Sequence, residues 1–387
     1  MCSGIILRCP PTRLSCPNGQ CRPALHDGVA YFVRCNTFVA RNADLAKGMA
    51  DTVGPRIIAI PRGFSIRRPK LSDADAIAAL INARARAESG VDLTDASEVL
   101  RELGDPTRNL NDENWLVIAE DGSLAAQLQL YEYAPFTTFV FDGDVHPDFV
   151  GRGIGTFLLN TIEARARREM HRAPAGERVD LQTRVNSSSL AAHALLEEAG
   201  FEHTRNWRRM EIDVTSPPTP PAAIDGITIR TLTRGADERL LWELMESAFA
   251  DHWGYAPMPF EEFLYYEIEG VKDFDPELFF LAMDDDRIVG AATCHPSRGG
   301  DPTLGWVGGL GVHREWRGRG IGQELLLTAF GAFHRRGHLR VGLHVDGSSL
   351  TGADRLYERA GMHEARLDYV YEKILRPATS QGVAASK

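Results

Sequence analysis

The order of apolar and polar residues along the chain predicts one succession of strands and helices, and that succession occurs twice. Alternating or continuous apolar runs predict strands, and apolar residues at a helical spacing predict helices. In the first copy the expected elements are strands at residues 64–68, 115–120 and 124–133 and a helix at 74–88. In the second copy they are strands at residues 227–231, 278–282 and 287–294 and a helix at 237–249. Further strands and helices follow in each copy, so the pattern predicts an α/β fold.

The two copies match most closely in a glycine-rich segment. Residues 145–159 read VHPDFVGRGIGTFLL and align without gaps with residues 312–326, which read VHREWRGRGIGQELL. Further along, ALLEEAGF at 194–201 aligns with RLYERAGM at 355–362. Repetition on this scale indicates a duplicated domain, because each copy is long enough to hold its own core.

A proline-rich stretch at residues 216–225 separates the copies. Proline lacks the amide donor that a helix or a central strand needs, so this stretch is expected to be a linker between domains at 63–215 and 226–379. Residues 1–62 are expected to be a poorly ordered extension and residues 380–387 a disordered tail. Domain-like patterning begins only after Met49, which suggests the hypothesis that translation starts there. A native peptide from the first 40 residues, found by mass spectrometry, would refute it.

Composition narrows the class of protein. A net charge of −10 argues against a general nucleic-acid binder, which needs a basic surface. No stretch approaches the roughly 20 apolar residues of a membrane span. Five of the six cysteines lie near the N-terminus at an irregular spacing without a CxxC pair, which does not predict a metal site: Cys2, Cys9, Cys16, Cys21 and Cys35. The two domains are almost free of cysteine, as is usual in a reducing cytosol, so we expect a cytoplasmic protein. Together with the charge and the lack of a long apolar stretch, this predicts no metal, no nucleic acid and no membrane among its partners.

The segment Arg317-Gly-Arg-Gly-Ile-Gly322 is the strongest chemical signal in the sequence. An apolar strand at 306–312 is expected before it and a helix at 323–336 after it. Glycines let the backbone turn tightly and leave its amides uncovered, and the helix N-terminus adds further amides that attract an anion. With two arginines beside these amides, the loop is suited to a pyrophosphate group.

Three other interpretations fit this loop less well. A P-loop would end in Lys-Ser or Lys-Thr, and a dinucleotide loop would have the spacing G-x-G-x-x-G. An ordinary strand-to-helix turn also uses glycine for clearance. Two copies in matching contexts make that plain interpretation the weaker one.

The loop resembles the signature of the GNAT acyltransferase superfamily, Gln/Arg-x-x-Gly-x-Gly/Ala, in which loop amides hold the pyrophosphate of coenzyme A. The resemblance also covers the strand at 340–345 and the helix ending in LYERAGM at 356–362, and the tandem arrangement resembles that of mycothiol synthase-like acetyltransferases. It implies two tandem domains, each with a mixed, largely antiparallel sheet flanked by helices. It also implies acetyl-CoA as co-substrate, with the main chain of Leu310, Gly311 and Val312 bonding its pantetheine arm. Its pyrophosphate would lie on the loop residues Arg317, Gly318, Arg319, Gly320, Ile321 and Gly322.

The resemblance assigns catalysis to the C-terminal copy. Tyr357 stands where GNAT enzymes carry the tyrosine that protonates the leaving thiolate, although a buried packing role is the alternative. The first copy has Leu196 at that position and Val150 in place of Arg317. Two such losses suggest a degenerate N-terminal domain, either a scaffold or a domain that still binds CoA.

The general base is left open by the sequence. Many GNAT enzymes use a carboxylate on the fourth strand, but this strand reads VGGLGV at 307–312. Asp251, His252, Glu261 and Glu262 are the candidates, and a water relay or a neutral acceptor are alternatives. The expected activity is acetyl transfer to a primary amine of a small molecule, by a monomer or a homodimer. A non-catalytic CoA-binding or protein-interaction module is the main competing function, and a dinucleotide-dependent enzyme is a third.

Overall fold

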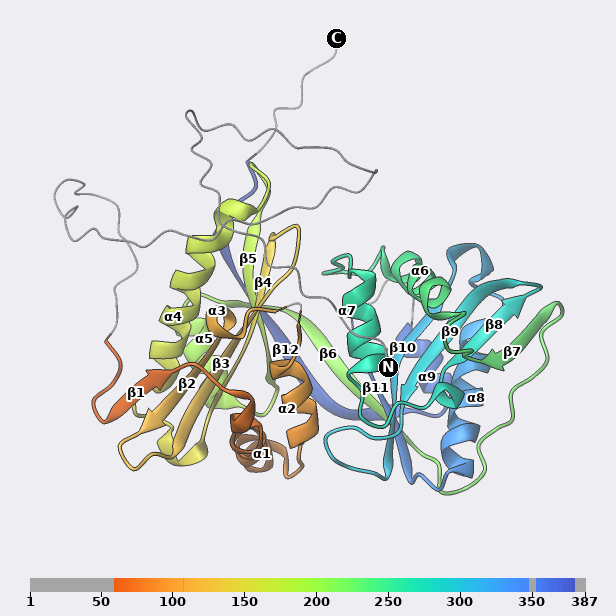
Figure 1. Ribbon diagram of the computed structural model, residues 1–387, viewed down its shortest axis with the longest axis horizontal. Helices are drawn as coiled ribbons and strands as arrows, with labels where there is room; N and C mark the ends of the chain where they lie inside the picture. Colours follow the sequence, from red (N-terminus) through yellow and green to blue (C-terminus); the bar gives the residue numbers. More distant parts are fainter. Residues whose placement is uncertain (1–58, 107, 348–352, 380–387) are drawn as a thin grey trace, which may run out of the picture. The chain divides into compact units, whose positions relative to one another are not determined.

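The computed structural model describes residues 59–106, 108–347 and 353–379, and these residues belong to one compact unit (Figure 1). The leader cysteines and most of the expected N-terminal extension lie outside the described residues, as does the C-terminal tail. The N-terminal repeat has the strands β1 (Phe64–Arg67), β2 (Asn114–Ala119), β3 (Leu124–Glu132), β4 (Thr138–Val145), β5 (Val179–Asn186) and β6 (Glu202–Asp213). Its α-helices are α1 (Ala74–Ser89), α2 (Ala96–Leu103), α3 (Leu110–Glu113), α4 (Ile154–Glu169) and α5 (Leu190–Glu198).

The C-terminal repeat follows the same order. Its strands are β7 (Ile227–Thr231), β8 (Phe280–Asp284), β9 (Arg287–His295), β10 (Leu304–Val312), β11 (Arg340–Asp346) and β12 (His363–Arg376). Its helices are α6 (Glu238–Phe249), α7 (Phe260–Leu264), the π-helical turn η4 (Tyr265–Glu269), α8 (Ile321–Arg335) and α9 (Ala353–Arg359). Short 3-10 turns are η1 (Leu71–Asp73), η2 (Pro147–Phe149), η3 (Met170–Arg172), η5 (Pro276–Leu278) and η6 (Arg314–Trp316). The predicted α/β class and tandem repeat are confirmed.

All these strands join one mixed sheet in the order β1-β2-β3-β4-β5-β12-β6-β11-β10-β9-β8-β7. The last strand of each repeat therefore pairs inside the other repeat. Strand β6 lies antiparallel to β11, with Met210 opposite Leu343, and β12 lies antiparallel to β5, with Tyr371 opposite Thr183. The two repeats are thus joined through the sheet itself as well as through the linker.

The exchanged strands also complete the opposite cores. Met210 and Val214 of the N-terminal repeat are buried in the core around α8, and Tyr371 and Leu375 of the C-terminal repeat are buried in the core around α4. The pattern of apolar residues in β6 and β12 does not indicate this exchange, because the two strands hold equivalent positions in the duplicated sequence.

This exchange predicts that damage to β12 destabilises the N-terminal repeat. Tyr371 is 2% exposed and its hydroxyl donates to Glu197 Oε1 at 3.1 Å. Tyr371→Ala is expected to lower the free energy of unfolding by about 3–5 kcal/mol, the usual cost of truncating a buried aromatic residue. The matched control Ile374→Ala, on the same strand but 52% exposed, is expected to change it by less than about 0.5 kcal/mol. Urea unfolding measures both, and equal losses would contradict the exchange.

In each repeat two parallel strands pair only at their beginnings. Pairing of β4 with β5 runs from Thr138 opposite Asp180 to Val140 opposite Gln182. Pairing of β10 with β11 runs from Leu304 opposite Arg340 to Trp306 opposite Gly342. Beyond these residues the strands diverge, so the main-chain groups on the inner edges of β4 and β10 are left for another partner.

Candidate functional site

The glycine loop has the same backbone shape in both repeats. Gly318 and Gly320 have φ angles of 78° and 87°, and their counterparts Gly151 and Gly153 have 80° and 79°. These angles lie in the left-handed region, where glycine carries no steric penalty. In the C-terminal copy, α8 starts at Ile321, directly after Gly320, and the first amides of a helix have no partner within the helix. A side chain built at Gly318 would meet no heavy atom within 4 Å, so the approach to the loop is open.

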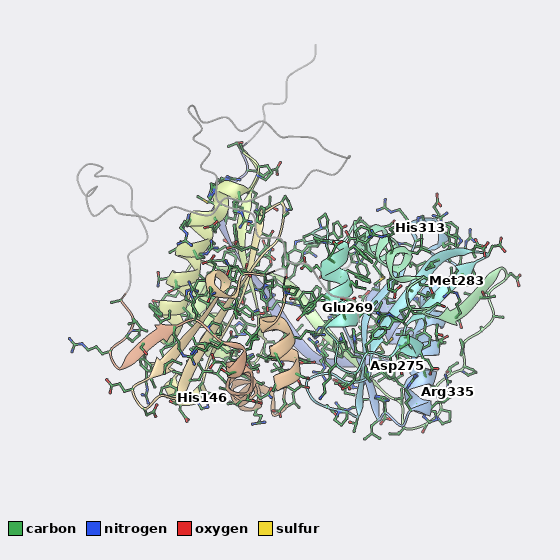
Figure 2. All side chains as sticks on the ribbon, in the orientation of Figure 1. His146, Glu269, Asp275, Met283, His313 and Arg335 are labelled. Atoms are coloured by element: carbon green, nitrogen blue, oxygen red, sulfur yellow. The ribbon has the colours of Figure 1, made fainter. Side chains whose placement is uncertain are left out.

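Equivalent histidines support the two loops from the preceding strand. His146 and His313, both labelled in Figure 2, follow β4 and β10 directly. The His146 Nδ1 accepts from the Asp148 amide at 3.3 Å, and the His313 Nδ1 accepts from the Glu315 amide at 3.4 Å. These bonds cap the 3-10 turns η2 and η6, which lead into the loops. Both loops therefore have the same defined conformation, and the N-terminal loop retains it.

Arg317 is held within the protein. Its guanidinium donates to the carboxylate of Asp251 at 2.9 Å and to the carbonyl of Ala248 at 2.7 Å, while its Nε donates to the Val312 carbonyl at 3.2 Å. It therefore fastens the loop to the end of α6 and to β10. Arg319 is exposed, so it is the loop arginine that faces solvent.

The predicted pantetheine segment lies on the diverging part of β10. Leu310, Gly311 and Val312 pair with Ala292, Ala291 and Gly290 of β9 on one edge. The other edge faces the gap toward β11. A side chain at Gly311 would lie 3.1 Å from both Ala248 and Met245 of α6, so this part of the strand is covered by that helix on one face.

Tyr357 is carried by α9 in the core beside the glycine loop. It is 7% exposed, and burial raises its pKa to about 12. The preceding residue, Leu356, lies 3.5 Å from a side chain built at Gly322, which places α9 against the first turn of α8. The N-terminal repeat has the same packing, with Leu195 against Gly155 and Leu196 buried in the core. The structure thus brings Tyr357 and the loop together, and its role as an acid stays a prediction.

The sequence candidates for a general base are dispersed. Asp251 is bonded to Arg317, and that bond, against the opposing effect of burial, lowers its carboxyl pKa. His252 lies 3.5 Å from Asp251 and packs against the Phe249 ring. Glu261 is exposed, whereas burial and the nearby Asp105 raise the pKa of Glu262.

A different group lies against the diverging strand: Glu267, His295 and Thr293. His295 Nε2 is 3.5 Å from Glu267 Oε2, and it would be 3.0 Å from a side chain built at Gly308. Thr293 Oγ1 would be 3.1 Å from one at Gly309. Burial raises the pKa of Glu267, but His295, Thr293 and Arg101 together lower it by more, so the pKa lies below its ordinary value.

The local backbone positions this group. Glu267 is on the π-helical turn η4, closed by a bond from the Gly270 amide to the Tyr265 carbonyl at 2.8 Å. Such turns are rare and are often found at functional sites. The pairing of β9 with β10 shifts register between Val307 and Gly309, a bulge of the kind that redirects strands beside active sites. The only sequence signal for this site was the glycine pair 308–309, because a π turn and a bulge leave no mark in the apolar pattern.

Comparisons with known proteins identify the family. A model of the acetyltransferase (GNAT) family matches residues 78–201 and again residues 241–362. The mycothiol acetyltransferase of Thermobispora bispora is 31% identical over 290 residues, covering 70% of this chain and 91% of that protein. The mycothiol acetyltransferase of Acidothermus cellulolyticus is 32% identical over 254 residues, covering 62% of this chain and 72% of that protein.

Solved structures give the same result for the fold. A GCN5-related N-acetyltransferase from Sphaerobacter thermophilus has a TM-score of 0.68 and 38% identity, covering 83% of this chain and 98% of that one. A tandem GNAT protein from the clavulanic acid biosynthesis pathway has a TM-score of 0.61 and 16% identity, covering 82% of this chain and all of that one. Among the described residues, no helix combines the length and the apolar character needed to cross a membrane.

Proposed function

The chain belongs to the acetyltransferase (GNAT) family, and from that premise we propose that its C-terminal repeat transfers an acetyl group from acetyl-CoA to a primary amine of a small molecule. The observation that carries this proposal is one continuous arrangement in that repeat. An open glycine loop, a diverging strand, a buried tyrosine and a Glu–His pair all adjoin β10 or α8. The small-molecule acceptor is supported by the relatives, which are mycothiol acetyltransferases.

The residues present fit acetyl-CoA. Gly318 is open to solvent and the amides at the start of α8 point out of the helix end, which suits a pyrophosphate. The unpaired inner edge of β10 offers Leu310, Gly311 and Val312 for main-chain bonds to the pantetheine arm. When bound, acetyl-CoA supplies an acetyl thioester whose carbonyl carbon is the electrophile.

His295 and Glu267 supply the base in this proposal. An acceptor amine arrives as an ammonium ion at neutral pH and must lose a proton before it can attack. The His295 imidazole accepts that proton, and the Glu267 carboxylate, 3.5 Å away, stabilises the resulting imidazolium. Gly308 is exposed and lies beside the His295 ring, so an acceptor can approach the ring there, whereas Met245 of α6 covers Gly309.

Tyr357 supplies the acid. Its raised pKa of about 12 keeps the hydroxyl protonated at neutral pH, so that it can donate to a sulfur that takes on negative charge. Arg317 acts by position, because its bonds to Asp251 and to the Ala248 carbonyl hold the loop against α6.

Release of free thiol from acetyl-CoA, measured with the full chain and a panel of small primary amines, tests the function. An N-acetylated product identified by mass spectrometry is the expected result. A protein that is stabilised thermally by CoA but acetylates no amine would instead be a non-catalytic CoA-binding module.

The loop itself gives a separate prediction. Gly320→Val is expected to weaken CoA binding at the C-terminal repeat by about 100-fold, because a β-branched residue at φ 87° is strained and its side chain covers the loop amides. Gly337→Val is the control for strain alone, since Gly337 also has a positive φ, 82°, but lies at the far end of α8. Calorimetry with CoA measures both. Undiminished binding in Gly320→Val would remove the loop from the site.

A further inference from the structure

A cavity of about 980 Å³ lies in the N-terminal repeat. It follows the gap between β4 and β5 and reaches the glycine loop at residues 150–156. Helices α1 and α2 line another side, and residues of the C-terminal repeat, among them Arg298, His344 and Arg366, close it. The repeat that the sequence suggested to be degenerate therefore contains a space of the size that a small ligand and part of its carrier would need.

Strand β4 of the N-terminal repeat carries two carboxylates, whereas the equivalent segment of β10 in the C-terminal repeat carries none. Asp142 and Asp144 on β4 occupy the positions of Gly309 and Gly311 on β10, and both line the cavity. Asp144 is already paired, with an ion pair to Arg84 and a hydrogen bond from Gln127. Asp142 forms no ion pair in the described part of the chain, but the Arg184 charge attracts it and the Tyr131 hydroxyl donates a hydrogen bond to it.

Glu102, on α2, lines the same cavity as Asp142. The proximity of the two carboxyl groups shows in their electrostatics: burial and the Asp142 charge raise the pKa of Glu102 to about 7. Burial likewise raises the pKa of Asp142. A carboxyl group with a pKa near the working pH is suited to accept a proton and to release it again.

An unsatisfied donor lies beside these carboxyl groups. Gln129 is 7% exposed, and its side-chain amide nitrogen has no hydrogen-bond partner among the described residues. Gln129 pairs directly with Asp142 across β3 and β4, and it lines the cavity. A buried donor without a partner is costly, which indicates that a ligand completing the site offers an acceptor here, such as the carbonyl oxygen of an acyl thioester.

Charges around the cavity favour a cation. Six carboxyl groups and four guanidinium groups line it. Arg84 is paired with Asp144 and Glu88, Arg298 lies 3.8 Å from Glu98, and Arg366 is bonded to Asp368. Glu102 and Asp142 form no ion pair among the described residues, although the charge of the fourth arginine, Arg184, attracts Asp142. Because carboxyl groups outnumber guanidinium groups by two, a bound ligand gains most by placing an ammonium group near these two carboxyl groups.

We propose that this cavity is a second acyl-acceptor site, which binds a primary ammonium compound at Glu102 and Asp142. The proposal rests on the family's transfer reaction but not on the C-terminal site. The Glu102 carboxylate takes one ammonium proton, the freed nitrogen forms its bond to the carbonyl carbon of an acyl thioester, and the carbon–sulfur bond breaks. Sulfur leaves with the electron pair, and the second nitrogen proton passes to solvent.

The absence of a tyrosine at Leu196 does not prevent this step. A thiol has an ordinary pKa of about 8.5, so a thiolate can depart near neutral pH without being protonated first. Transfer at this site is expected to be slower than at the C-terminal site by the contribution of an acid.

Binding of n-hexylamine, with hexan-1-ol as its uncharged counterpart, tests the site by calorimetry on the full chain. Glu102→Gln, alone and together with Asp142→Asn, is expected to raise the Kd of hexylamine at least tenfold and to leave that of hexanol unchanged. Glu120→Gln, an exposed position on the same repeat, is the control. Equal hexylamine binding by wild type and by the double variant, or no binding by wild type, would overturn the proposal.

Activity separates the two sites. Thiol release that persists in a Glu267→Gln, Tyr357→Phe chain and is lost when Glu102→Gln is added supports the second site. Residual release that is indifferent to Glu102→Gln contradicts it. Full activity in the Glu267→Gln, Tyr357→Phe chain would refute the C-terminal mechanism instead, so the two failures are distinguishable.

Discussion

Tyr357→Phe is expected to lower kcat for amine acetylation at the C-terminal site by about 100-fold or more, the usual contribution of a positioned general acid. The substitution removes one hydroxyl from a side chain that is 7% exposed and leaves the ring in the core, so the fold and the CoA affinity should be preserved. The measurement is steady-state kinetics with acetyl-CoA, together with the Kd of CoA from calorimetry.

A tyrosine in the other core provides the control. Tyr371→Phe also removes a hydroxyl from a buried ring, but in the N-terminal core and away from β10. It is expected to change stability slightly and kcat hardly at all. If Tyr357→Phe behaved in the same way, Tyr357 would be a packing residue, the alternative that its burial allows.

Glu267→Gln is the second substitution with a large expected effect. It keeps the shape of the side chain but removes the charge that stabilises a protonated His295, so kcat/KM should fall by about 100-fold. Glu269→Gln is the matched control, since Glu269 lies two residues away on the same turn and is exposed (Figure 2). Equal rates for the two variants would exclude Glu267 from the proton transfer.

The pH dependence of the free energy of unfolding gives a second test of Glu267. The pKa of Glu267 is lower in the folded protein than its ordinary value of 4.5. The ionised carboxylate therefore contributes stability that is fully present above pH 4.5 and is lost as the pH falls through the folded-state pKa. The stability of wild type relative to Glu267→Gln should decline over that acidic range, which urea unfolding at several pH values measures.

Much of the fold was predictable because it depends on local periodicity. The expected helix at 74–88 is α1, the expected helix at 323–336 is α8 apart from its first turn, and the expected strand at 227–231 is β7. The glycine loops were predictable for a similar reason. Positive φ angles at two glycines and the start of a helix one residue later are properties of a short segment, so the glycine positions in the sequence predict them.

The candidate site was predictable only in part. The loop and Tyr357 were found because their spacing within the sequence is fixed by one strand and two helices. Glu267 and His295 were not, because they come from a π turn and a bulged strand that only packing brings together. The same limit explains Glu102 and Asp142, which lie forty residues apart in a repeat that two substitutions had marked as degenerate.

By itself, then, the sequence determined the duplicated α/β domain and the conformation of the two glycine loops, since both follow from local patterns of apolar residues and glycine. Only the tertiary structure decided that β6 and β12 change places and that one repeat closes a cavity in the other. Equivalent strands in a duplicated chain carry the same pattern, so no local preference distinguishes pairing within a repeat from pairing between repeats. The pairing is determined by how the whole sheet and its two cores pack.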